Sequence, residues 1–499
     1  MPAAAAAATP VMADLRLVLP EVILAIVATA LLAGGFMGTG KNRARLLAGL
    51  ALGGLAVAFL ALWPGYRELT GAEGNNMTGL FSQMLVTDRF GLYFRATFIA
   101  VAAMVVMYST RYVEQHDLPA AEFYSLLLFA VVGMMLMAGS IELITIYIGL
   151  ELTSISSYIL AGLMRNDPKS NEAAVKYFLT GSIASAVFLF GISLLYGLTG
   201  TTNLVAMWMV DPAATAVTGP GWNVLMAVAS VFILGGLGFK VAAVPFHMWA
   251  PDTYEGAPTP VTGFFSVGPK GAAFAALLRI FPLGIVLLST RWIGIMAVVS
   301  VITMTLGNLS ALLQTNIKRM LAYSSIAQAG YILVGFAAAA GGGAGGVMFY
   351  VLAYAFINLG VFAIILHLST QGQGETVESF NGLSQRSPAI AAAMVVLLLG
   401  LIGVPFTSGF FAKFYIFGAA VNAGLAWLAV VMAVNSAVSV GYYYVIVRNM
   451  YLVQPDEGSG QLTVTPGLAV TITVATVVTL ALGLASQPII GWIASSAGM

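Results

Sequence analysis

A long series of apolar runs dominates the chain, and each run is long enough to cross a bilayer as a helix, which takes about 20 residues. In lipid only helices and closed barrels satisfy the backbone, and barrel strands would alternate in polarity, which these runs do not. The sequence therefore predicts an all-α polytopic membrane protein. The fourteen expected spans are 17–37, 45–63, 90–108, 121–139, 140–163, 173–198, 222–249, 259–288, 292–313, 319–338, 347–368, 388–418, 424–448 and 465–486.

Composition excludes several function classes. Hydrophobic residues make up 60% of the 499 residues and charged residues 8%, against about 45–50% and about 25% in soluble domains. A net charge of +1 provides no basic field for nucleic acid. The chain has no cysteine, which excludes disulfides, Cys-ligated iron–sulfur clusters and thiolate zinc sites. We therefore expect a chain that works within the bilayer and holds no cofactor of its own.

Positive charges in the short loops predict the orientation of the chain. With the N-terminus outside, the inner loops carry ten Lys and Arg residues and the outer side carries four. Inner loops of membrane proteins are enriched in these residues. Both termini are therefore expected on the outer, periplasmic side. The inner-loop cations are Lys41, Arg43, Arg45, Arg111, Arg165, Lys169, Lys318, Arg319, Arg386 and Arg448.

Four ionisable residues lie inside apolar spans: Glu151, Lys240, Lys270 and Lys413, in spans five, seven, eight and twelve. A charge at a helix centre costs about 2.5–3.5 kcal/mol on insertion scales, so it usually faces a partner or water. A buried lysine near a carboxylate can hold or release a proton, because burial and the carboxylate act on it in opposite directions. These four residues are the predicted proton relay. Helix–helix ion pairs or side chains that reach the membrane surface remain the structural alternative.

Several other polar residues are weaker candidates. Glu21 and Glu142 lie near span ends and are expected to be solvated, although Glu142 could instead sit at an interface with a neighbouring chain. Arg279 could extend to the outer end of its span. The secondary candidates are Lys176, Lys318, His247 and His367. Either of the two histidines could relay a proton at neutral pH, although a histidine in such a position more often only packs in the core.

Two prolines interrupt apolar runs, Pro245 in VAAVPFHMW and Pro405 in GVPFTSGFF. Proline removes a helical hydrogen bond and frees carbonyls, which need another partner. The prolines lie in spans seven and twelve, so the two broken helices run in opposite directions, as in transporters with inverted repeats. We expect repeats over 121–290 and 291–450, a three-helix segment over 1–120 and a C-terminal transmembrane helix within 451–499. The alternative is that proline is simply common in such helices.

Five sequence stretches carry a more specific signal, and together they extend over about 120–450. The stretches are GLELTSISSYIL (149–160), EAAVKYFLTGSIASA (172–186), FKVAAVPFHMWAPDTYEGAPTPVTGFFS (239–266), NIKRMLAYSSIAQAGY (316–331) and GVPFTSGFFAKFYIF (403–417). They resemble the antiporter-like subunits of respiratory complex I and of multisubunit Na⁺/H⁺ antiporters. Length and motif details are most similar to the N-type subunits of bacterial NADH:quinone oxidoreductase.

The resemblance implies roles for the four buried residues. In the family the glutamate of span five pairs with the lysine of span seven, which correspond to Glu151 and Lys240. A central lysine in span eight corresponds to Lys270, and the final ionisable residue to Lys413. A lysine rather than a glutamate at position 413 favours the N-type over the M-type subunits.

The resemblance also implies a location and partners. It predicts a multi-pass subunit of the bacterial inner membrane that translocates protons. The expected partners are the M and L subunits, the small subunits K, J, A and H, and the peripheral arm. FMN, the iron–sulfur clusters and the quinone would bind in those partners. A cation/proton antiporter subunit without redox coupling, and a structural scaffold, remain the alternatives.

Overall fold

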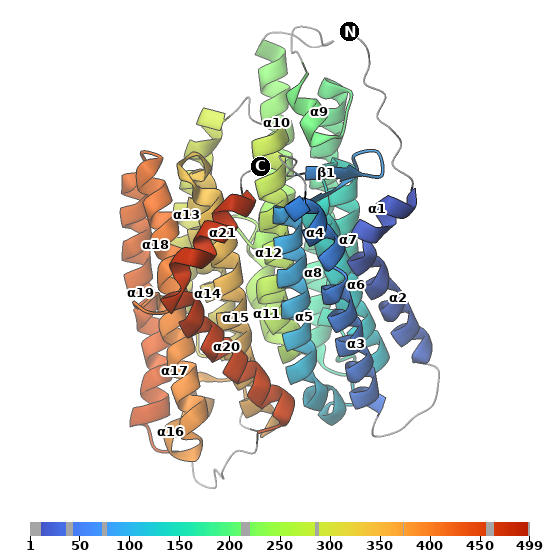
Figure 1. Cartoon of the computed structure of the whole chain (residues 1–499). Helices are drawn as coiled ribbons and strands as arrows, with labels where there is room; N and C mark the ends of the chain where they lie inside the picture. The colour runs from blue at the N-terminus through green and yellow to red at the C-terminus, as the bar shows by residue number, and fades with distance from the viewer. Residues whose placement is uncertain are drawn as a thin grey trace.

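The chain folds into a bundle of long, roughly parallel helices with connections at its two ends (Figure 1). The computed structural model describes residues 11–35, 43–71, 77–210, 220–284, 289–372, 374–455 and 464–497. Lys41, one of the ten predicted inner-loop cations, lies outside these residues. Within them, twelve helices are long and apolar enough to cross a membrane. The other two predicted spans coincide with shorter apolar helices, Leu19–Gly34 and Pro388–Ile402. The predicted all-α membrane fold is confirmed, while the number fourteen stays a prediction.

The elements follow one another in a simple order, with one hairpin among the helices. The α-helices are α1 (Val11–Leu17), α2 (Leu19–Gly34), α3 (Arg43–Leu60), α4 (Trp63–Gly71), α5 (Arg89–Gln115), α6 (Ala120–Gly139), α7 (Leu143–Ala161), α8 (Pro168–Thr199), α9 (Leu204–Trp208), α10 (Pro220–Val241), α11 (Trp249–Gly256), α12 (Thr259–Gly284), α13 (Ser289–Ala311), α14 (Ile317–Ala337), α15 (Gly343–Thr370), α16 (Leu383–Arg386), α17 (Pro388–Ile402), α18 (Ser408–Asn422), α19 (Ala426–Leu452), α20 (Pro466–Leu484) and α21 (Ser486–Ala497). Two 3₁₀ turns, η3 (Ala339–Gly341) and η4 (Val377–Phe380), complete the helical part.

The hairpin is a feature that the apolar pattern did not predict. Strands β1 (Met77–Leu80) and β2 (Leu85–Asp88) pair antiparallel, with Met77 opposite Asp88. Asp88 then caps α5 by accepting a hydrogen bond from the Gly91 N–H at 2.7 Å. A side-chain oxygen at this position satisfies a backbone donor that a helix start leaves unpaired. The hairpin therefore fixes where α5 begins.

The centre of the bundle is formed by three helices. The most apolar windows of α12, α14 and α15 are 100%, 94% and 89% buried, against 33% for α8 and α19. A helix that is hydrophobic all round belongs in such a position. Lys270 lies on α12 and is therefore in the middle of the protein, whereas Lys240 and Lys413 lie on helices nearer its surface.

Both proline-containing runs are broken. Pro245 lies between α10, which ends at Val241, and α11; Pro405 lies between α17 and α18. In the first break the carbonyl of Phe239 accepts a hydrogen bond from the indole of Trp249 at 2.9 Å. At the second, Gly403 turns the chain with φ +88°, a conformation that glycine adopts without strain. At the first break a side chain thus pairs with a backbone carbonyl, whereas at the second a glycine provides the turn.

Glycines allow two pairs of helices to approach closely in similar ways. A Cβ on Gly133 of α6 would lie 2.5 Å from the Gly149 carbonyl of α7, and one on Gly330 of α14 would lie 2.5 Å from the Met304 backbone nitrogen of α13. Small residues at such contacts let helix backbones pack together in lipid. The pairs α6–α7 and α13–α14 occupy corresponding places in the two expected repeats.

Candidate functional site

Lys240 lies at the end of α10 and is held by two hydroxyls. Its ammonium donates to Ser154 Oγ at 2.9 Å and to the Tyr177 hydroxyl at 3.2 Å. The ammonium also lies 5.4 Å from the centre of the Tyr177 ring, within the range of a cation–π interaction. Its partners come from α7 and α8, so the lysine joins three helices. Only 2% of its surface is exposed.

Glu151 does not contact Lys240 directly. No ion pair of 4.0 Å or less joins the two side chains within the described residues. Ser154, which contacts the ammonium, follows Glu151 by three residues on α7. One carboxylate oxygen, Oε1, is buried without a hydrogen-bond partner. The expected pairing of Glu151 with Lys240 therefore stays a prediction: in the structure Ser154, and not Glu151, contacts the ammonium.

Lys270 occupies the buried centre of the bundle. Its ammonium donates to Ser325 Oγ at 2.6 Å and to the Ser325 carbonyl at 3.3 Å, and lies 5.5 Å from the centre of the Tyr254 ring. A cavity of about 10 Å³ adjoins it, and Tyr354 is another of its lining residues. A single water needs about 10–15 Å³ and polar partners. Lysine, serine and tyrosine side chains supply such partners here.

Lys413 caps the end of the broken helix α17. Its ammonium donates to the carbonyls of Leu401 and Ile402 at 3.0 and 2.8 Å, and to Ser436 Oγ at 2.8 Å. Its centre of charge lies 4.7 Å from the centre of the Tyr331 ring. A helix C-terminus carries partial negative charge, so it favours a cation. The break thus creates the site that holds this lysine.

A row of polar groups on α14 lies between Lys270 and Lys413. Ser325 binds Lys270, and Gln328, one turn further along, donates from Nε2 to the Leu401 carbonyl at 3.2 Å. The same carbonyl accepts from Lys413. The hydroxyl of Tyr350 donates to Gln328 Oε1 and fixes the amide orientation. The structure therefore brings these two lysines to the same line of polar groups.

Aromatic rings fill the space between Lys240 and Lys270. Tyr177 stacks on Trp249 with ring centres 4.4 Å apart, and Trp249 meets Tyr254 edge-on at 6.2 Å. The Tyr254 hydroxyl is buried and has no hydrogen-bond partner within the described residues. Direct polar contact ends at Tyr177 on one side and at Ser325 on the other. The first half of the predicted relay is therefore less continuous than the second.

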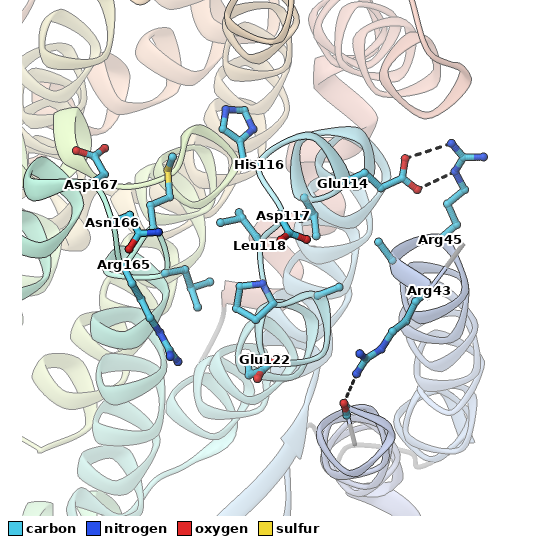
Figure 2. A pocket seen from close by; sticks show the side chains of 17 residues that line it. Arg43, Arg45, Glu114, His116, Asp117, Leu118, Glu122, Arg165, Asn166 and Asp167 are labelled. Atoms are coloured by element: carbon cyan, nitrogen blue, oxygen red, sulfur yellow. Dashed lines mark hydrogen bonds and ion pairs between the residues drawn. The ribbon is translucent and has the colours of Figure 1, made fainter. Parts of the chain in front are cut away.

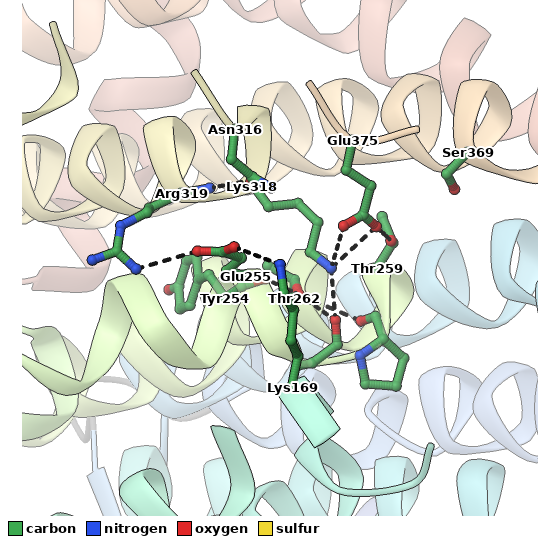
Figure 3. A network of polar contacts seen from close by, with 12 residues as sticks. Lys169, Tyr254, Glu255, Thr259, Thr262, Asn316, Lys318, Arg319, Ser369 and Glu375 are labelled. Atoms are coloured by element: carbon green, nitrogen blue, oxygen red, sulfur yellow. Dashed lines mark hydrogen bonds and ion pairs between the residues drawn. The ribbon is translucent and has the colours of Figure 1, made fainter. Parts of the chain in front are cut away.

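Two secondary candidates belong to a charged network at the expected inner end of the bundle. Lys318 is buried and pairs with Glu375 at 3.1 Å, and its ammonium also donates to the Ala257 carbonyl at 2.9 Å (Figure 3). Lys176 is exposed and pairs with Glu172 and Asp252, both at 2.7 Å. These lysines have acidic partners in contact, unlike the three relay lysines.

The two candidate histidines are both separate from the row of lysines. His247 lies in the break between α10 and α11, and its Nδ1 is buried without a partner. His367 lies near the end of α15, is 2% exposed, and its Nε2 is likewise unpaired. Neither histidine contacts Lys240, Lys270 or Lys413 within the part of the chain that the structure describes.

Two buried arginine–carboxylate pairs were missed by sequence reasoning. Arg279 binds both oxygens of Asp88 at 2.6 and 2.7 Å and donates from Nε to the Ala138 carbonyl at 3.0 Å. Arg95 pairs with Glu21 at 2.6 Å, and both side chains are buried. The expectations that Arg279 extends to the membrane surface and that Glu21 is solvated are therefore wrong. The missed signal is an arginine within two turns of a span end, accompanied by an acid near the end of another span.

Glu142 is also buried rather than solvated. It caps α7 by accepting hydrogen bonds from the N–H groups of Ile144 and Thr145 at 3.0 and 2.6 Å. Burial raises the pKa of Glu142, but hydrogen bonds, that of Thr202 foremost among them, outweigh burial and lower the pKa overall. Its role in the structure is that of a helix cap.

A large cavity lies apart from the three buried lysines. It has a volume of about 1330 Å³ and is open at the expected inner end, between the start of α3, the α5–α6 connection and the α7–α8 connection (Figure 2). Arg45 pairs with Glu114 at one side of it, at 2.8 Å. Its other charged lining residues are Arg43, Asp117, Glu122, Arg165 and Asp167. The lining carries both positive and negative side chains, so the cavity has no electrostatic potential of a single sign.

Known proteins share both the sequence and the fold. Residues 140–439 match the family described as NADH:quinone oxidoreductase/Mrp antiporter, TM. NADH-quinone oxidoreductase subunit N 2 of Symbiobacterium thermophilum is 47% identical over 467 residues, which cover 91% of this chain and 92% of the relative. Subunit N of Moorella thermoacetica is 42% identical, with 97% and 99% covered.

Solved structures agree with this relationship. A chain of respiratory complex I from Thermus thermophilus with bound aureothin superposes with a TM-score of 0.78 at 31% identity, covering 96% of this chain and 100% of that one. A chain of the Mrp complex from Dietzia sp. DQ12-45-1b has a TM-score of 0.82 at 21% identity, covering 98% and 96%, which shows a shared fold alone. Identity over nearly the whole length decides the assignment: this chain belongs to the family of NADH-quinone oxidoreductase subunit N.

Proposed function

We propose that the chain carries one proton pathway in the membrane arm of an NADH:quinone oxidoreductase. The observation that carries the proposal is the state of its three buried lysines. Each ammonium is held by hydroxyl or carbonyl oxygens, and none contacts a carboxylate within the described residues. An unpaired charge at this depth is costly, and such groups in membrane proteins mark ion or proton pathways.

The first step of the pathway involves Lys240 and Glu151. The carboxylate acts on the ammonium from beyond contact distance, so a change in the charge or position of Glu151 alters how firmly Lys240 holds its proton. The Ser154 and Tyr177 hydroxyls orient the ammonium. Glu151 therefore modulates the lysine rather than neutralising it permanently, which suits a group that has to load and unload.

The later steps involve Lys270 and Lys413. Ser325 accepts from Lys270, and a hydroxyl can take and give a proton. Gln328 has an amide, which positions neighbouring groups but is no proton carrier. Transfer from Ser325 to Lys413 therefore requires water beside the Gln328 amide, in the manner of water-mediated hydrogen bonds. Lys413 would release the proton toward the outer side.

Redox chemistry belongs to partner subunits in this proposal. The chain has no cysteine to ligate an iron–sulfur cluster. FMN, the clusters and the quinone would be bound by the peripheral arm and the neighbouring membrane subunits, including the M, L, K, J, A and H types. The protein would reside in the bacterial plasma membrane with both termini on the periplasmic side, as the loop charges indicate.

The internal organisation fits two inverted repeats, 121–290 and 291–450, after a segment over 1–120 and before one over 451–499. The broken runs α10–α11 and α17–α18 and the glycine contacts of α6–α7 and α13–α14 support this division. In transporters of this kind the broken helices line the transport site. Lys240 and Lys413 each lie beside one break.

The rival proposals are a cation/proton antiporter subunit and a structural scaffold. The antiporter would use the same buried residues, but the solved antiporter chain shares only the fold with this protein. The first test is purification from native membranes. Co-migration with flavin- and iron–sulfur-containing subunits supports the proposal, and isolation with other membrane subunits alone favours the antiporter.

The second test separates a pump from a scaffold. In vesicles containing the assembled complex, Lys270→Ala and Lys413→Ala should each lower the number of protons translocated per electron. The double variant should be little worse than the poorer single variant, because members of one pathway are not additive. Arg45→Gln, which removes a surface ion pair, is the matched control. An unchanged ratio in all three lysine variants would leave the chain as a scaffold.

A further inference from the structure

The short helix α11 is held from two sides by its acidic residues. Asp252 pairs with Lys176 of α8 and with Arg319 of α14, both at 2.7 Å. Glu255 pairs with Lys169 of α8 at 3.0 Å and with Arg319 at 3.2 Å (Figure 3). The two carboxylates thus connect the first expected repeat to the second. Arg319 is the only cation among these that contacts both carboxylates.

The same helix contacts the surroundings of two relay lysines. At its start, Trp249 stacks on Tyr177, whose hydroxyl accepts from Lys240. Toward its end, the Tyr254 ring lies against Lys270. Any shift of α11 along its axis therefore moves the Tyr254 ring beside Lys270 and the Trp249 ring that packs on Tyr177, the partner of Lys240.

A further contact anchors the end of α11 to α14. Lys318, which precedes Arg319, donates to the carbonyl of Ala257, the residue that follows α11. This lysine is buried and its charge is balanced by Glu375. α14 therefore holds both the acidic face and the end of α11, and it also carries Ser325, the partner of Lys270.

We propose that this network, the α11 clamp (Asp252, Glu255, Lys169, Lys176 and Arg319), sets the spacing between Lys240 and Lys270, with Arg319 as its principal positioning residue. The proposal rests on the proposed proton pathway. Direct polar contact is missing between these two lysines, so a transfer between them depends on how the intervening rings and water are placed. Misplacement by about 1 Å can cost roughly a hundredfold in such a step.

The charge state of the clamp supports a permanent connection. Burial raises the pKa of Asp252, but hydrogen bonds from Lys176 and Arg319 outweigh it and lower the pKa overall. The same balance, with Lys169 as the leading partner, lowers the pKa of Glu255. Both carboxylates are therefore ionised at neutral pH. Lys169 and Lys176 are well exposed, at 68% and 45%, and screened by water, whereas Arg319 is 31% exposed.

The test compares Arg319→Gln with the control Arg45→Gln in the assembled complex. Arg45 has an ion pair with Glu114 at the same end of the bundle, away from the clamp. In Arg319→Gln, hydrogen exchange of the 249–256 amides should accelerate about tenfold or more. Coupled proton translocation should fall by roughly tenfold to a hundredfold. Arg45→Gln should change neither quantity. Normal exchange and normal translocation in Arg319→Gln would overturn the proposal.

A covalent replacement of the clamp separates position from charge. The chain has no native cysteine, so Glu255→Cys with Arg319→Cys introduces the only two thiols on it. The open double variant should lose coupled translocation, and a short bis-maleimide bridge between the thiols should restore it. Native complex treated with the same reagent controls for thiols of partner subunits. Complete bridging without recovery would show that the charges themselves act, as in surface proton collection, and would refute the clamp.

Failure of the clamp is distinguishable from failure of the pathway. If Lys240→Ala abolishes pumping while Arg319→Gln leaves it intact, only the clamp is refuted. If Lys240→Ala leaves pumping intact in a fully assembled complex, the pathway through this lysine is refuted, whatever Arg319→Gln does.

Discussion

Lys240 and Lys413 lie beside the two broken helices in different ways. Lys240 belongs to the last turn of α10, before the break, and donates to two side-chain hydroxyls from α7 and α8. Lys413 belongs to α18, after the break, and donates to two carbonyls at the end of α17 and to one hydroxyl of α19. One site is built from side chains and the other mainly from backbone.

This difference separates a tunable site from a fixed one. The surroundings of Lys240 include a titratable carboxylate, Glu151, three residues before its partner Ser154 on α7. Lys413 is held by carbonyls that remain whatever side chains α17 carries, and these carbonyls favour the charged lysine. We infer that regulation acts on the first lysine and that the second provides a constant exit.

The largest expected effect comes from removing the lysines themselves. Lys240→Ala should lower coupled proton transfer by about a hundredfold or more, the usual contribution of a positioned acid–base group. Lys240→Arg should not restore it, because arginine does not readily give up its proton. Proton uptake by vesicles, normalised to assembled complex on native gels, measures both. Full pumping in Lys240→Ala would show that this residue is not part of the pathway, and Lys240 could then not be its tunable site.

The carboxylate provides the next test. Glu151→Gln should slow coupled turnover by about tenfold, because the charge that acts on Lys240 is lost. Adding Ser154→Asp should recover part of the rate, since residue 154 contacts the ammonium. Ile155→Glu should not, because that side chain is 52% exposed and faces away. Turnover in these three variants is the measurement. Equal recovery at 154 and 155 would show that distance to Lys240 is not what matters.

Two serine variants compare the sites directly. Ser154→Ala removes one of two hydroxyls from Lys240, and a hydrogen bond to a charged group is worth about 1.5–3 kcal/mol. Roughly tenfold slower coupled turnover should follow. Ser436→Ala leaves Lys413 its two carbonyls, so a change below about threefold is expected. A larger loss in Ser436→Ala than in Ser154→Ala would reverse the distinction between a tunable and a fixed site.

The smallest expected effect is on amide protection in α11, which follows the first break as α18 follows the second. α11 is clamped by ionised carboxylates, whereas the only charged residue of α18 is Lys413. The lowered pKa values of Asp252 and Glu255 mean that the clamp is complete above the unfolded values and is lost only as pH falls through the folded ones. Amide protection of 249–256, corrected for intrinsic exchange, should therefore be constant from about pH 8 to about pH 6. Loss of protection within that range would contradict ion-pair clamping.

The sequence predicts the helices well because a bilayer imposes one length and one polarity on every span. The breaks at Pro245 and Pro405 are visible for a similar reason, since proline has a fixed local effect. Contacts between distant segments are not visible in this way. Arg95 and Glu21 are 74 residues apart in sequence, and only the fold brings them together.

The candidate site shows the same limit. The apolar pattern predicts how deep Glu151 and Lys240 lie in their spans. Whether Ser154, three residues after Glu151, faces the Lys240 ammonium depends on how α7 is rotated against α10. Likewise, nothing in the charge pattern around Asp252 indicates that α11 turns toward α14 after the break. Rotation and direction are set by side-chain packing, which a single sequence does not reveal.

The Arg279–Asp88 pair has a consequence for how the protein is made. The partners are 191 residues apart, and at about 5–20 residues per second their synthesis is separated by roughly 10–40 s. During that time Asp88 has been made and its partner Arg279 has not. Because a charge inside the bilayer is costly, we infer that Asp88 stays close to water at the membrane surface until α12 is made, and that α5 settles at its final depth only then.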